Sequence, residues 1–155
     1  MIEAYMPQKE AEKLAPEKMV EALLRWDKSL FDAPPQTDTE LFAALRRWVA
    51  SEDWREFTAS LRSVAESTAS NTTALSRFVN THWGCSFPAW LNRIRLAAFL
   101  RMSAENAVHS IEGILHACGF KSRSSFYATL QKEIGATPGE LKNMHIPAFN
   151  NEVTG

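Results

Sequence analysis

The sequence has little cysteine, no long apolar run and no strand-like alternation, and each absence excludes a class of protein. Its two cysteines, Cys85 and Cys118, cannot form a disulfide framework, and two alone do not make a zinc site. No stretch approaches the roughly 18 uninterrupted apolar residues of a membrane span, so we expect no membrane contact within this chain. The polar start of the chain also lacks the basic-then-apolar order of a signal peptide. We therefore expect a reducing, cytoplasmic setting.

The residues that catalysis or metal binding would need are scattered. The histidines do not show the spacing of metal ligands; they are His82, His109, His116 and His145. The chain has no Ser–His–Asp grouping, no glycine-rich phosphate loop and no paired carboxylates. We therefore predict a protein that is not an enzyme, with no catalytic residue, metal or cofactor.

The formal net charge of −1 hides an uneven distribution. Residues 1–56 carry 12 acidic and 8 basic side chains, a balance of −4, whereas residues 57–155 carry 6 acidic and 9 basic side chains, a balance of +3. A basic half is typical of chains that bind nucleic acid. Because the excess is modest, we expect DNA binding of moderate strength and steep salt dependence.

The sequence does contain the same pattern twice, about fifty residues apart. Residues 75–87 and 126–138 are each a helix-like stretch that ends in glycine, at Gly84 and Gly135. A hydroxyl residue that can cap a new helix follows each glycine two positions later. A short apolar-patterned segment and a tight turn precede each copy. This repeat predicts two helix-turn-helix units in tandem, and hence two helices presented to one DNA duplex.

Helical periodicity elsewhere predicts an all-α fold of about seven helices, with an N-terminal helical extension. Residues 1–38 are expected to be this extension or a linker, with a helix from Pro16 to about Phe31, and Thr37 or Thr39 can cap the next helix. The module itself should span 39–143, followed by a flexible tail at 144–155. Within it we expect a first unit at about 58–84, a connector helix at 86–102, a second unit at about 110–135 and a final helix at 137–143.

Particular residues mark the helix ends within the two units. Asn71 is the expected cap of the second helix in the first unit. Ser110 and Ser122 are the expected caps in the second unit, and Gly119 between them should adopt a left-handed backbone. The connector is apolar over much of its surface, which is typical of a helix packed on both sides.

These motifs resemble the AraC/XylS family of bacterial transcription regulators over about residues 40–143. The most specific stretch includes the Gly-Phe-Lys-Ser turn at 119–122, Phe126, and the Gly-Ala-Thr-Pro ending at 135–138. The resemblance implies a seven-helix DNA-binding module, in which a connector helix joins two helix-turn-helix subdomains. It also implies that the third and sixth helices of the module enter successive major grooves.

The chain departs from the family pattern at several positions. Ala128 stands where the family commonly has arginine, and Asn80 and Thr81 stand where it often has basic residues. Ala69 occupies the usual glycine position of the first turn. Larger residues than usual stand at Phe99 and Leu115. Fewer cations weaken both the grip on phosphates and the recognition of bases, so these departures affect affinity more than fold.

We expect the outward faces of the two recognition helices to contact DNA. The candidate residues are Thr72, Thr73, Ser76, Arg77 and Asn80 in the first unit, and Lys121, Ser122, Arg123, Ser124, Tyr127 and Lys132 in the second. Arginine can pair with both acceptors of a guanine, so Arg123 is the expected base-reading residue, with Lys121 and Lys132 on phosphates. The alternatives are a solvated Arg123, a Tyr127 without a role and an intramolecular ion pair for Arg77. The connector arginines are expected on a solvated or salt-bridging face; they are Arg93, Arg95 and Arg101.

The expected function is sequence-specific binding of double-stranded DNA by a bacterial transcription regulator, or by the DNA-binding part of a longer one. Further partners considered are a second copy of the chain, held through the N-terminal helices, and RNA polymerase. The alternative is a degenerate helix-turn-helix module that does not bind DNA. Such a module would use Leu23, Leu24 and Trp26 to bind a protein partner.

Overall fold

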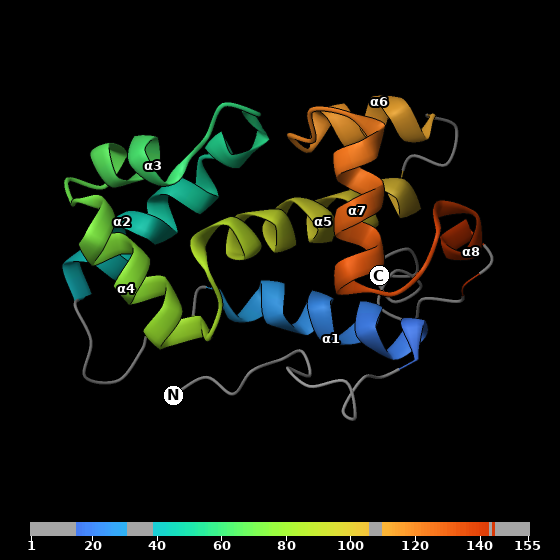
Figure 1. Cartoon of the computed structure of the whole chain (residues 1–155), viewed down its shortest axis with the longest axis horizontal. Coiled ribbons are helices and arrows are strands. Elements are labelled where there is room, and N and C mark those ends of the chain that lie inside the picture. Colours follow the sequence, from blue (N-terminus) through green and yellow to red (C-terminus); the bar gives the residue numbers. More distant parts are fainter. Residues whose placement is uncertain (1–14, 31–38, 106–109, 143, 145–155) are drawn as a thin grey trace.

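The computed structural model describes residues 15–30, 39–105, 110–142 and 144, and these ranges hold helices and no strand (Figure 1). The helices are α1 (Pro16–Ser29), α2 (Thr39–Ala50), the short 3-10 helix η2 (Asp53–Arg55), α3 (Leu61–Ser67), α4 (Thr72–Trp83), α5 (Phe87–Glu105), α6 (Ile111–Ala117), α7 (Arg123–Glu133) and α8 (Pro138–Lys142). The all-α prediction is confirmed. Helices α2–α8 are the seven of the expected module, and α1 precedes them. In the described part of the chain, no helix is long and apolar enough to cross a bilayer.

Helix α5 runs through the middle of the molecule, between the group α2–α4 and the group α6–α8 (Figure 1). It packs against α1, α4, α6, α7 and η2. Residues 93–100, eight in succession, are all buried, so this part of the helix has no solvent-facing side. The expected connector is therefore present, and it continues three residues beyond the predicted end at 102.

Two of the connector arginines form ion pairs that join α5 to other helices. The Nε of Arg93 lies 2.9 Å from Oε1 of Glu133, the last residue of α7, and both side chains are nearly buried. Arg101 pairs with Asp27 of α1. The expected ion pairing is confirmed for Arg93 and for Arg101. Arg93 does not lie on a solvated face, however, because α7 covers it.

Arg95, also buried, uses backbone carbonyls rather than a carboxylate. Its guanidinium donates hydrogen bonds to the oxygens of Trp54 and Glu56, each at 2.8 Å. Burial lowers the pKa of this guanidinium. Arg55 in the same segment donates to the carbonyl oxygen of Ala117 at the end of α6, at 2.9 Å. Hydrogen bonds therefore connect the chain around η2 both to the connector and to the second unit. The expectation that Arg95 lies on a solvated or salt-bridging face is wrong.

Helix α1 buries its apolar side in the same core. The buried residues of this helix are Met19, Val20, Ala22, Leu23, Leu24 and Trp26. Leu23, Leu24 and Trp26 are therefore not available to bind another protein, and this part of the interaction alternative is wrong. The helix ends at Ser29, two residues before the predicted end. The expected cap at Thr37 and nearly all of the expected tail lie outside the described residues.

An aromatic cluster packs the first unit onto the connector. Trp83 of α4 lies 5.3 Å from Trp90 of α5, measured between ring centroids, and 6.2 Å from Phe42 of α2. His82 stands edge-on to Trp83 at 4.5 Å, and burial lowers the pKa of this histidine. Trp83 and Trp90 are both buried in the core.

We predict that Glu133→Ala lowers the free energy of unfolding by about 3–5 kcal/mol, because it leaves the Arg93 charge buried without its carboxylate. Replacing both partners with apolar residues, Arg93→Met with Glu133→Leu, should recover most of this loss. The measurement is urea denaturation followed by circular dichroism. Lys18→Ala, which breaks the exposed pair with Glu21, is the control and should change the free energy by at most about 1 kcal/mol. A Glu133→Ala variant as stable as that control would contradict the assignment.

Candidate nucleic-acid interface

The internal repeat of the sequence is also present in the backbone hydrogen bonds. In the turn of the first unit, the amide of Ser70 donates to the carbonyl oxygen of Ala65 at 2.8 Å. In the second unit, the amide of Phe120 donates to the carbonyl oxygen of Leu115 at 3.0 Å. The two turns are therefore built alike, fifty positions apart, as the duplicated pattern predicts. The second turn is one residue longer, because Lys121 stands between Phe120 and the next helix cap.

The recognition helices α4 and α7 begin at the predicted caps. The Asn71 side chain accepts a hydrogen bond from the amide of Ala74 at 2.8 Å. Ser122 accepts from the amide of Ser125 at 3.2 Å, and the Ser125 hydroxyl accepts in return from the amide of Ser122. A cap of this kind stabilises a helix by about 1 kcal/mol. Both helices are thus held at the end that would approach the DNA backbone.

The first helix of each unit also starts at a serine cap. Ser110 caps α6 as predicted, accepting from the amide of Gly113 at 3.1 Å. In the first unit, α3 begins at Leu61 rather than at the predicted residue 58. The reason is a reciprocal cap between Ser60 and Ser63, which leaves Thr58 outside the helix.

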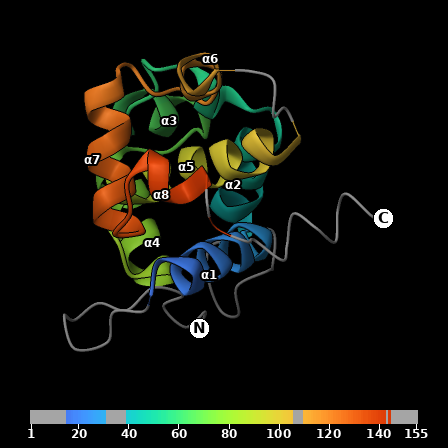
Figure 2. The same cartoon turned by 90° about the vertical axis from the view of Figure 1, so that its right-hand side faces the viewer.

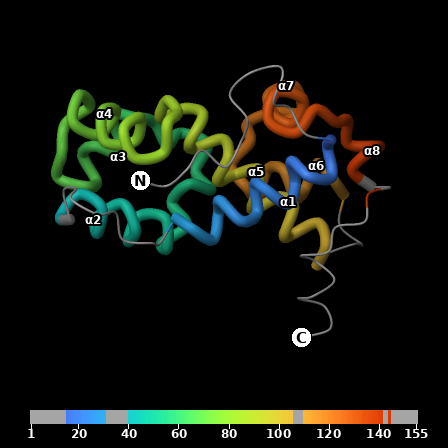
Figure 3. The backbone as a smooth tube through the Cα atoms, turned by 90° about the horizontal axis from the view of Figure 1, so that it is seen from below, coloured from blue at the N-terminus to red at the C-terminus, as the bar shows by residue number. Residues whose placement is uncertain are grey.

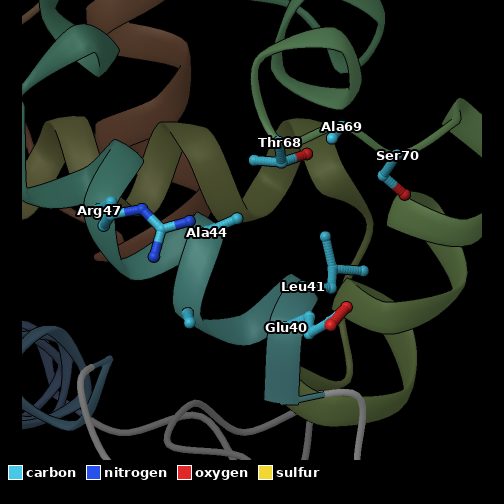
Figure 4. A pocket seen from close by; sticks show the side chains of 8 residues that line it. Glu40, Leu41, Ala44, Arg47, Thr68, Ala69 and Ser70 are labelled. Carbon is cyan, nitrogen blue, oxygen red and sulfur yellow. The ribbon is translucent and has the colours of Figure 1, made fainter.

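The two turns meet different surroundings, and this decides which residue each can hold. Ala69 (φ +55°) and Gly119 (φ +95°) are both left-handed. Ala69 is exposed and lines a hollow of about 420 Å³ between α2 and the turn, so its methyl group has room (Figure 4). A Cβ on Gly119 would lie 2.6 Å from the carbonyl oxygen of Trp54 and 2.7 Å from Nε of Arg95. The second turn therefore requires glycine, and the first does not.

Helices α4 and α7 lie on the same side of the connector. They share the left-hand side of Figure 2, with α5 to their right, and the upper edge of Figure 3, with α5 below them. Of the eleven predicted contact residues, ten are exposed and Ser76 is half-buried. The structure therefore places the two helices on one face of the molecule, with the predicted residues at least partly exposed on or next to them, in two groups.

The predicted residues of the first unit line one shallow hollow of about 530 Å³. Its lining consists of Thr72, Thr73, Ser76, Arg77 and Asn80, together with Leu61 and Thr81. Within the described residues, Arg77 makes no ion pair, so the intramolecular alternative for this arginine is not supported there. This hollow offers hydroxyl and amide groups with a single cation.

The second unit presents its charges differently. Arg123, the first residue of α7, places NH2 3.1 Å from Oε1 of Glu112 on α6, and both side chains are more than half exposed. Lys121 and Lys132 are also exposed, the first just before the start of α7 and the second near its end. Arg123 is therefore not simply solvated, because its guanidinium forms an ion pair with a carboxylate.

Sequence reasoning did not identify Glu112. It lies eleven residues from Arg123 and on the other side of a turn, where helical periodicity gives no spacing rule. The repeat could have found it, because α6 and α7 pack as α3 and α4 do, so residue 112 falls on the outward face beside the start of the recognition helix.

The electrostatic character of the two recognition helices is uniformly basic. Their exposed charged side chains are Arg77 on α4 and Arg123 and Lys132 on α7. The one carboxylate in these helices, Glu133, is buried against Arg93. Phosphates approaching this face would meet these cations and the amide ends of two capped helices, which favour anions, and also the carboxylate of Glu112 beside Arg123.

Comparison with known proteins agrees with this architecture. A helix-turn-helix domain family model matches residues 64–144, just over half of the chain's 155 residues. A solved structure of a protein of unknown function from Listeria innocua is similar to the fold, with a TM-score of 0.56 and 20% sequence identity. That likeness covers 65% of this chain and 96% of the other. No curated protein sequence matches the chain.

We predict that Gly119→Ala lowers the free energy of unfolding by about 2–5 kcal/mol, because a left-handed backbone and a steric overlap act together. Gly135→Ala is the matched control, since Gly135 has a φ of +80° but no atom within 4 Å of an added Cβ. That control should lose only about 1–2 kcal/mol, the cost of the left-handed backbone alone. Thermal or urea unfolding measures both variants. Equal losses at the two glycines would show that the contact with Trp54 is unimportant.

Proposed function

Because the chain belongs to the AraC-type helix-turn-helix family, whose domain is a DNA-binding regulatory unit and not a catalytic one, we propose that it binds double-stranded DNA in a sequence-specific manner. Helices α4 and α7 would enter successive major grooves. The observation that carries the proposal is the placement of two capped, exposed and basic helices on one side of a rigid connector.

The dimensions of the connector support binding by both helices at once. With 19 residues, α5 is about 28 Å long at 1.5 Å per residue. Successive turns of the major groove are about 34 Å apart. The recognition helices lie on the same side of α5 but at different points along it, α4 against Trp90 near its start and α7 against Phe99 farther on, so the frame would reach a separation of this order.

The two units would divide the work. In the second unit, the exposed Arg123 would pair with a base, and the exposed Lys121 and Lys132 would contact phosphates. In the first unit, Thr72, Thr73, Ser76, Arg77 and Asn80 offer short polar side chains around one cation. Short hydroxyl groups discriminate bases weakly, so this unit would mainly set the register of the protein on the duplex.

A regulator of this kind has protein partners as well. If a second copy of the chain binds, it would use a surface other than the apolar side of α1, which is buried against α5. Contact with RNA polymerase at a promoter is a second proposed interaction, and a binding assay with the polymerase on the bound duplex tests it.

The decisive experiment is the selection of bound sequences from a random duplex pool, followed by titration of the preferred duplex and a mixed-sequence duplex at several salt concentrations. Convergence on one sequence supports the proposal. A protein–protein module without DNA binding would enrich no sequence and bind neither duplex at low salt.

We predict that Arg123→Ala weakens binding to the preferred duplex by about 1–3 kcal/mol and weakens binding to mixed-sequence DNA far less. The reason is that a base contact is made only on the preferred sequence. Lys132→Ala is the control, and it should weaken binding to both duplexes by similar factors, as expected for a phosphate contact. Unchanged affinity of Arg123→Ala for the preferred duplex at low salt would remove this arginine from the interface.

A further inference from the structure

A carboxylate beside a DNA-facing arginine is unexpected, because it repels the phosphates that such a surface attracts. Glu112 nevertheless lies 3.1 Å from Arg123. Its other oxygen lies 3.9 Å from Nε2 of His116, on the same helix. His116 is itself anchored, with Nδ1 3.1 Å from the carbonyl oxygen of Phe120 in the turn. Glu112 thus lies one helical turn before a histidine that contacts the turn leading to α7.

The first unit has nothing comparable, although it is built on the same plan. Counting from the serine caps Ser60 and Ser110, the position of Glu112 corresponds to Arg62. Counting from the caps of the recognition helices, the position of Arg123 corresponds to Thr72. The ion pair is thus a property of the second unit alone and not of the helix-turn-helix framework.

An arginine in such an ion pair keeps most of the N–H donors with which it can recognise a base. Guanidinium has five N–H donors, and the pair with Glu112 engages the NH2 group. The remaining donors are free to face the acceptors of a guanine. A guanidinium that is already oriented loses less conformational freedom on binding, and immobilising one flexible side chain otherwise costs about a factor of two to ten in affinity.

We propose that Glu112 is a specificity-determining positioning residue, which orients Arg123 for one base pair at the expense of general attraction to DNA. This inference rests on the proposed function. It predicts opposite effects on two measurable quantities. Without Glu112, binding to DNA of any sequence becomes tighter or stays equal, because a negative charge is removed, while discrimination at the base pair read by Arg123 declines.

The test uses the full chain with the selected duplex, and with duplexes that differ from it at one base pair. Arg123→Ala first identifies the base pair at which preference is lost. Glu112→Ala should then reduce discrimination at that base pair by about two- to tenfold, without weakening binding to a mixed-sequence duplex. Glu66→Ala is the matched control, since Glu66 is an exposed carboxylate on α3 with no ion pair among the described residues. It should leave discrimination unchanged.

The double variant Glu112→Ala with Arg123→Ala separates positioning from other effects. It should discriminate no worse than Arg123→Ala alone, because Glu112 acts through the arginine. Further loss in the double variant overturns the proposal. So does unchanged or improved discrimination in Glu112→Ala, which would make Glu112 only a competitor for the guanidinium. If the unaltered chain binds no duplex, the proposed function itself fails and this inference fails with it.

Discussion

The structure depends on a helix that has no free surface along eight consecutive residues. Every polar side chain on such a helix needs a partner on a neighbouring element. Two arginines of α5 lie in this buried stretch, where a charge without a partner would strongly destabilise the fold. Arg93 meets Glu133 of α7, and Arg95 meets the carbonyl oxygens of Trp54 and Glu56. Each charge can be buried only if its partner element is in place, so these contacts fix the second unit and η2 relative to the connector.

The features that sequence could predict are those set within a few residues. Asn71 and Ser122 cap helices because a side-chain oxygen and an amide three residues later always meet in this way. The left-handed Gly119 is predictable for a similar local reason. The partners of Arg93 and Arg95 could not be predicted in this way, because they are about forty residues away along the chain and only packing brings them together. Glu112 escaped for the same reason, at a shorter distance along the chain.

The two units share a backbone plan but are not interchangeable. The first turn faces an open hollow and holds Ala69, whereas the second is pressed against Trp54 and requires glycine. The arginines also stand at different places. Arg123 opens its recognition helix, while Arg77 is the sixth residue of its own. A duplicated pattern therefore predicts the architecture well and the chemistry poorly, because the two units share helix caps and a turn hydrogen bond but differ in their surface residues.

The stiffness of α5 has a mechanical consequence for any duplex that occupies both recognition helices. The Arg93–Glu133 ion pair and the packing of both units on α5 would oppose rotation of one unit relative to the other. Any mismatch between their spacing and the pitch of straight B-form DNA would then have to be absorbed by curvature of the nucleic acid. Bending a site of 20–30 base pairs by 40–90° costs about 1–6 kcal/mol and depends on base sequence. The protein would thus favour sites with flexible base-pair steps between the two contacted grooves, although it makes no contact with those base pairs.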